Sequence, residues 1–121
     1  MPAIGTTAVG LMAGLHGYIM VLEMFLWTTP RGRKAFRLTQ EFAEKTKVLA
    51  ANQGLYNGFL MAGLVWGLAH PAPDVAKQIK LFFLSCITVA GVYGGLTANK
   101  KIIFIQGIPG AISLGAVLLG L

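Results

Sequence analysis

Two side chains stand out because they can exchange protons and yet lie in a long apolar stretch at the start of the chain. His16 and Glu23 are the only residues between Pro2 and Pro30 that ionise near neutral pH. A spacing of seven residues places both on one face of a helix. An imidazole and a carboxyl group are the usual partners of general acid–base catalysis, so we predict that both are catalytic.

Further polar side chains lie in the later apolar stretches. Counted from the ends of those stretches, they fall at similar depth on one side of a membrane, and we expect one pocket that is open to that side. Tyr93 is the third predicted catalytic residue, because a phenol can donate a hydrogen bond to a developing oxyanion. The predicted substrate-binding residues are Asn52, Gln53, Tyr56, Asn57 and Gln106.

The elements that position these side chains are strongly apolar. Hydrophobic residues make up 55% of the chain and charged residues only 12%, about half the roughly 25% expected of a globular protein. The mean hydropathy is +0.70. Apolar stretches cover about 5–27, 48–69, 81–97 and 102–120, each near the ~20 residues that cross a bilayer. We therefore predict an all-α membrane protein in which residues 1–121 form a single four-transmembrane-helix bundle.

The basic residues are unevenly distributed between the loops. Eight of the ten lysines and arginines lie in the loops at 31–47 and 98–101, whereas only Lys77 and Lys80 lie between the second and third stretches. The positive-inside rule then predicts a multi-pass protein of the bacterial inner membrane with both termini on the non-cytoplasmic side, and the pocket open to the cytoplasm. The net charge of +6 suits anionic lipid headgroups, and no pattern of aromatic and basic residues predicts a nucleic-acid partner.

The connection at 31–47 has two interpretations. Thr39 can cap a helix that begins near Gln40 and enters the bilayer near Lys47, or the segment is an ordinary solvated turn. Gly-xxx-Gly spacings in the first three stretches predict close helix packing, either within the four helices alone or shared with other copies in a homo-oligomer. Pro109 predicts a kink in the fourth stretch. Cys86 and two distant histidines do not form a metal site.

Several of these polar residues also have a purely structural interpretation. Glu23 can pair with Arg31 or Lys34 near the membrane surface, and Trp27 can belong to an interfacial aromatic belt. The amides at Asn52, Gln53 and Asn57 can join helices by hydrogen bonds without binding a ligand. These alternatives stay open at the level of the sequence.

Three strings resemble a small bacterial integral membrane family that is catalogued as domain of unknown function 1304. They are Glu23–Lys34 (EMFLWTTPRGRK), Lys47–Phe59 (KVLAANQGLYNGF) and Val89–Thr97 (VAGVYGGLT). The resemblance extends over nearly the whole chain. It implies four membrane spans but no activity.

A second string, Ala51–Gly58 (ANQGLYNG), resembles the second-helix motif of membrane-bound styrene oxide isomerase, a haem-containing trimer of four-helix subunits. The resemblance implies that Asn57 contacts substrate and favours a trimer over a dimer. The histidine that ligates iron in that family falls near Asn52, so a haem in this chain would need His16.

Two kinds of function fit these residues, besides a structural or accessory membrane protein without its own ligand. One is a membrane protein that binds or transforms a small lipophilic molecule by isomerase or epoxide-opening chemistry. The other is a proton-coupled exporter, similar to small multidrug transporters with a lone glutamate in the first helix. The uneven loop charge favours the first, because an antiparallel transporter dimer needs nearly balanced loops.

Overall fold

A computed structural model describes residues 2–121, and that part of the chain contains helices and no strand. The predicted all-α class is therefore confirmed. The helices are α1 (Ala3–Met24), α2 (Pro30–Phe36), α3 (Gln40–Ala69), α4 (Pro73–Thr97), the π-helical turn η1 (Ile103–Gly107) and α5 (Ile108–Leu118).

The chain divides into two compact units, which we describe separately. The central unit is Gly14–Met61, and the terminal unit combines the segment up to Ala13 with Ala62–Leu121. Two helices, α1 and α3, begin in one unit and end in the other.

Two helices, α1 and α4, are long and apolar enough to cross a membrane, and the segment Ile103–Leu118 is apolar but shorter. This finding indicates a membrane association. The stretch predicted at 48–69 lies inside α3, which does not reach the same apolarity. Asn52, Gln53 and Asn57 lower its hydropathy.

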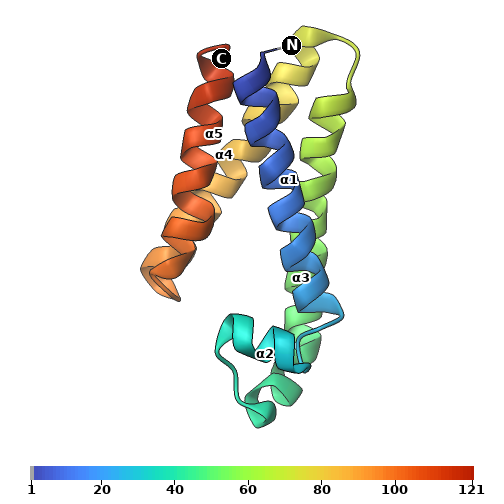
Figure 1. The fold of residues 1–121 in the computed structure, drawn as a ribbon, viewed down its shortest axis with the longest axis vertical. Helices are drawn as coiled ribbons and strands as arrows, with labels where there is room; N and C mark the ends of the chain where they lie inside the picture. The colour runs from blue at the N-terminus through green and yellow to red at the C-terminus, as the bar shows by residue number, and fades with distance from the viewer. Residues whose placement is uncertain (1) are drawn as a thin grey trace. The chain divides into compact units, whose positions relative to one another are not determined.

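In the terminal unit, α4 and the last helical segment form an antiparallel hairpin (Figure 1). One face of α4 is buried along its length, through Ile79, Leu84, Ile87 and Gly91. A Cβ atom on Gly91 would overlap the backbone of Gly107 in η1. Glycine at this position therefore lets the two backbones touch, which is the close packing that the Gly-xxx-Gly spacing predicts.

The opposite face of α4 is apolar and exposed. Phe82, Val89 and Leu96 recur every seven residues and are 63%, 68% and 76% exposed. A soluble protein rarely leaves such a continuous apolar stripe in contact with water. The two faces of α4 together suit a helix that packs on protein with one side and on lipid with the other.

The predicted irregularity at Pro109 takes the form of a wide turn just before the proline. The Ile108 amide donates to the Ile103 carbonyl, five residues earlier. Proline has no amide hydrogen to donate and its ring crowds the preceding turn. A π-turn at this point absorbs the missing hydrogen bond without ending the helix.

In the central unit, the second half of α1 runs beside the first part of α3, and α2 lies at their connected end (Figure 1). A Cβ atom on Gly54 would meet the Met24 side chain, and one on Gly58 would meet the sulfur of Met20. The Gly54-xxx-Gly58 step therefore provides the surface on which α1 packs.

Local caps set the end of α1's connection to α2, the end of α2 and the start of α3. Thr29 Oγ1 accepts a hydrogen bond from the Gly32 amide at 3.3 Å and starts α2. Arg37 ends α2 in the left-handed conformation, with φ of 55°. Thr39 Oγ1 accepts from the Phe42 amide at 3.1 Å, so α3 begins at Gln40 as the first interpretation predicts. The sequence did not predict α2 as a separate helix.

Candidate functional site

The central unit contains a buried carboxyl–amide pair. Asn57 Nδ2 donates a hydrogen bond to Glu23 Oε1 at 2.6 Å, and Glu23 is only 6% exposed. The same amide nitrogen is 3.3 Å from the Gln53 carbonyl of its own helix. No ion pair joins Glu23 to Arg31 or Lys34 among residues 2–121. Glu23 is thus held by a neutral amide rather than by a cation.

Glycine explains why these two side chains can meet. A Cβ atom on Gly54 would lie 3.0 Å from the Cβ of Glu23 and 3.1 Å from the Met20 carbonyl oxygen. Gly54 is one helical turn before Asn57, so α3 approaches α1 closely beside the pair. A larger residue at this position would separate the helices and lengthen the hydrogen bond.

Six of the eight predicted site residues lie in the central unit, but the structure describes different surroundings for each. His16 is fully buried, and Tyr56 is 66% exposed. Asn52 is exposed and donates to the Val48 carbonyl of its own helix at 2.8 Å. Among the amides of α3, Asn57 is the one that bonds to Glu23.

The other two predicted residues, Tyr93 and Gln106, lie in the terminal unit. Tyr93 is on α4 and 70% exposed, and Gln106 lies in η1. Their part in a pocket with Glu23 stays a prediction.

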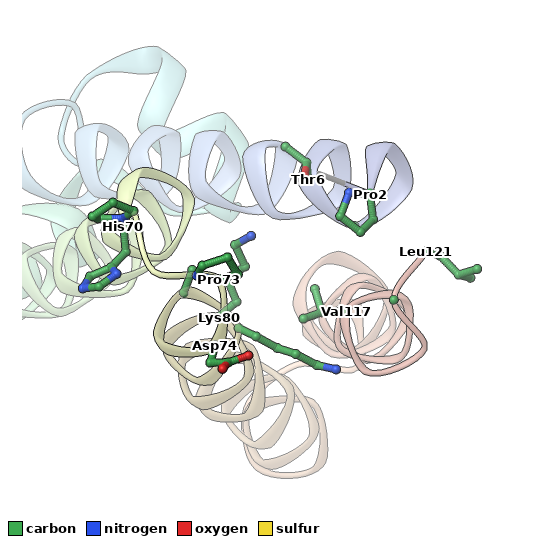
Figure 2. Close-up of a pocket in the computed structure, with 13 residues that line it drawn as sticks. Pro2, Thr6, His70, Pro73, Asp74, Lys80, Val117 and Leu121 are labelled. Carbon is green, nitrogen blue, oxygen red and sulfur yellow. The ribbon is translucent and has the colours of Figure 1, made fainter.

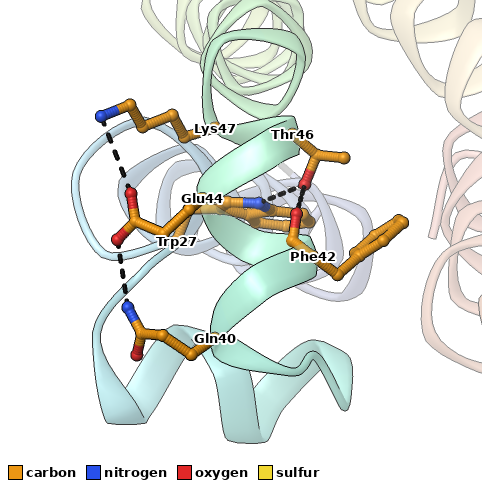
Figure 3. A network of polar contacts seen from close by, with 6 residues as sticks. All are labelled: Trp27, Gln40, Phe42, Glu44, Thr46 and Lys47. Carbon is orange, nitrogen blue, oxygen red and sulfur yellow. Dashed lines mark hydrogen bonds and ion pairs between the residues drawn. The ribbon is translucent and has the colours of Figure 1, made fainter.

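Trp27 joins the segment between α1 and α3 to the first turns of α3. Its Nε1 donates to Thr46 Oγ1 at 3.0 Å, and that hydroxyl donates to the Phe42 carbonyl at 2.8 Å (Figure 3). The Trp27 ring also packs on Phe36 of α2, with centroids 4.8 Å apart. Glu44 adds a second network on the same helix, because it accepts from Gln40 at 3.0 Å and pairs with Lys47 at 3.8 Å. Trp27 therefore has a specific role in holding α2 against α3, beyond that of a belt residue.

The two positions at which a haem ligand was expected, Asn52 and His16, do not fit a haem group. The position that corresponds to the iron ligand is near Asn52, whose amide is a poor iron ligand and already bonds within α3. The imidazole of His16 is fully buried and takes part in another interaction, so a macrocycle has no room beside it.

The terminal unit contains a feature that the sequence analysis missed. A cavity of about 420 Å³ is lined by residues from both ends of the chain and from the start of α4 (Figure 2). None of the eight predicted site residues lines it. Two lysines next to a proline-rich segment were the signal in the sequence that could have indicated it. Lys77 and Lys80 were assigned to a loop, but they lie in the first turns of α4.

The arrangement around Glu23 can bind and exchange a proton. Glu23 Oε1 accepts the hydrogen bond from Asn57. The other carboxyl oxygen of Glu23 can then bond to a ligand. An amide that donates to one oxygen fixes the orientation of the carboxyl group. Such a group can hydrogen-bond a polar atom of a lipophilic molecule or transfer a proton to it.

Comparison with known proteins bears out the first resemblance. The family described as "Protein of unknown function (DUF1304)" matches residues 10–118. The chain is also 37% identical over 92 residues to the uncharacterised protein YpaA of Lactococcus lactis. The matched region covers 74% of this chain and 76% of that protein. No solved structure matches, so the likeness to styrene oxide isomerase still rests on the Ala51–Gly58 string. The chain belongs to the DUF1304 family.

Proposed function

We propose that the chain is an integral membrane protein that binds a small lipophilic molecule at Glu23 and Asn57 and can transform it by acid–base chemistry. The observation that carries the proposal is the 2.6 Å hydrogen bond between these side chains, on a helix apolar enough to span a membrane. Ionisable residues within membrane helices are costly and mark functional sites by default.

The proposed architecture is the predicted four-helix membrane bundle. The exposed apolar stripe of α4 supports lipid contact, and the eight basic residues of the loops at 31–47 and 98–101 support a cytoplasmic position for those loops. Both termini are then on the non-cytoplasmic side of the bacterial inner membrane. The exposed apolar surface and the single orientation also suit a parallel homo-oligomer, for which we favour a trimer.

Epoxide opening is the reaction that this pair suits best. In its protonated form, the Glu23 carboxyl can donate its proton to an epoxide oxygen as one C–O bond breaks. A hydride shift to the resulting cation and return of the proton to the carboxylate give the carbonyl isomer. The step needs no oxidant, reductant or nucleotide, and the Asn57 amide keeps the carboxyl oriented throughout.

The test compares the purified wild-type protein with Glu23→Gln and with Glu41→Gln, the same change at an exposed glutamate of α3 outside the predicted site. Styrene oxide is the probe, and its conversion to phenylacetaldehyde is followed by gas chromatography. We expect Glu23→Gln to lose turnover by about 100-fold, typical of a general acid, while Glu41→Gln retains it. Equal turnover by Glu23→Gln, or none above background by the wild type, would contradict the enzyme proposal.

A proton-coupled exporter is the second candidate, favoured by the buried carboxyl group on the first helix. In that case the lipophilic cation tetraphenylphosphonium should bind the wild type in competition with protons and should not bind Glu23→Gln. The position of Glu23 argues against this candidate. It is the last residue but one of α1, whereas transporter sites lie near the middle of the membrane.

A further inference from the structure

The cavity of the terminal unit is a second site, separate from the residues of the proposed function. It lies where the first turn of α1, the loop before α4 and the end of the chain come together (Figure 2). The Gly5 amide donates to the Leu121 carbonyl at 2.9 Å and closes one side. Its volume of about 420 Å³ is in the range of small-molecule sites.

The cavity wall combines apolar surface with two cations. Prolines and aliphatic side chains provide much of the lining, among them Pro71, Pro73 and Val117. Lys77 and Lys80 reach it from consecutive turns of α4, and Asp74 is the one acidic side chain in the lining. Among the charged side chains of the lining, the two lysines therefore outnumber the aspartate.

Lys80 is unusual because it is buried without a counter-ion. It is only 9% exposed, and its alkyl chain packs against Gly67, where a Cβ atom would lie 2.8 Å from the Lys80 Cγ. Within residues 2–121, the side chains of Lys77 and Lys80 form no hydrogen bond or ion pair, and Asp74 pairs with neither. The Lys80 ammonium group keeps access to solvent, because no buried side-chain nitrogen of the described residues lacks a hydrogen-bond partner, and it is therefore available to a ligand in the cavity.

We propose that this cavity binds the anionic headgroup of an amphiphile, a carboxylate or a phosphate carried on an apolar chain. Lys80 and Lys77 supply the charge, and the proline-rich wall accepts the first part of the chain. Lysine is a common phosphate ligand, which acts as a point charge rather than as a fork. The sources of such a group in a membrane are free fatty acids and anionic phospholipids.

The test measures binding to the purified full chain in dodecyl maltoside by native mass spectrometry. Oleate and phosphatidylglycerol are the anionic probes, monoolein is the uncharged control, and inorganic phosphate is the headgroup without a chain. The variants are Lys80→Met and Lys77→Met, which remove a charge but keep most of the side-chain length, and Lys80→Arg, which retains it. Lys101→Met removes an exposed lysine outside the cavity and serves as the matched control.

We expect Lys80→Met to weaken binding of the anionic amphiphile by about tenfold, which is the effect of losing one charge-assisted contact. Lys80→Arg should stay within about threefold of the wild type because it keeps the charge, and Lys101→Met should match the wild type. If Lys80→Met does not fold, as judged by circular dichroism, Lys77→Met provides the same comparison.

Tighter binding of oleate would identify a fatty acid as the source, and tighter binding of phosphatidylglycerol a phospholipid. The proposal is wrong if neither probe binds, if monoolein or inorganic phosphate binds as tightly, or if both lysine variants leave binding unchanged. Glu23 lies outside the cavity, so failure of the epoxide test leaves this measurement unaffected.

Discussion

The side-chain amide of Asn57 donates to the carboxyl oxygen of Glu23 at 2.6 Å, across the contact that Gly54 opens between α1 and α3. Two residues 34 positions apart in the sequence thus form a short polar contact in a largely apolar setting. The pair gives the central unit both a structural link and a group that can do chemistry.

Replacing Asn57 with leucine should destabilise the protein, because Glu23 would stay buried without its donor. We expect a loss of about 1–3 kcal/mol in the free energy of unfolding, the usual cost of an unsatisfied buried group. Thermal unfolding in detergent, followed by circular dichroism, measures it. The double variant Glu23→Leu with Asn57→Leu should recover part of this loss. If the effects of the two single variants simply add, the hydrogen bond does not couple the residues.

Gly32→Ala should disrupt the connection at α2. A Cβ atom at Gly32 would overlap the carbonyl oxygen of Leu26, and both are backbone positions that cannot rotate away. We expect a loss of about 1–3 kcal/mol, as for other overpacked sites. Gly115→Ala is the control, because nothing lies within 4 Å of its position and alanine favours a helix. We expect trypsin to cleave the segment 31–37 faster in Gly32→Ala than in the wild type, and at the wild-type rate in Gly115→Ala.

Trp27→Phe should keep the ring contact with Phe36 but lose the hydrogen bond to Thr46. A net hydrogen bond is worth about 0.5–1.5 kcal/mol, so we expect a loss of stability of that size. Thr46→Val removes the acceptor instead, and the double variant should be no less stable than the worse single variant. A cost for Trp27→Phe that persists in the Thr46→Val background would assign the effect to ring size.

The proposed orientation predicts opposite labelling of two connections. In a Cys86→Ser background, Lys34→Cys should resist a membrane-impermeant maleimide in intact spheroplasts, whereas Ala72→Cys should react. Both positions are exposed in the structure, so access depends on the side of the membrane. Lysed cells provide the control, in which both should react. Labelling of Lys34→Cys in intact spheroplasts would reverse the topology.

Local signals in the sequence predicted much of the fold. The Thr39 cap and the start of α3 at Gln40 depend on neighbouring residues, and so does the irregularity before Pro109. The helix α2 was missed because three of its seven residues are basic and the segment carries no apolar period. Its end at Arg37 depends on a left-handed backbone conformation that a non-glycine residue does not predict, whereas Thr29 followed by Pro30 is a helix-start pattern visible in the sequence.

The candidate site was predictable in part. Glu23 and Asn57 both stood out as polar residues in apolar stretches, but their pairing depends on the close approach at Gly54, a tertiary feature. Lys80 was overlooked because positive charges near a turn usually indicate a solvated loop. Its burial arises only when α4 starts at Pro73 and turns that side chain toward Gly67.

The π-turn before Pro109 also determines how the last helix tolerates changes in length. A turn of this kind holds one residue more than an α-turn between its hydrogen-bonded groups, so it contains a residue that deletion can remove without breaking the helix. Such a deletion would rotate the preceding segment by about 100° relative to α5, the angle between successive residues of an α-helix. Gly107 would then no longer face Gly91, while Gly110 would still face Ile87. The turn thus sets the rotational phase between the two parts of the helix, and a one-residue insertion or deletion there changes which side of the first part packs on α4.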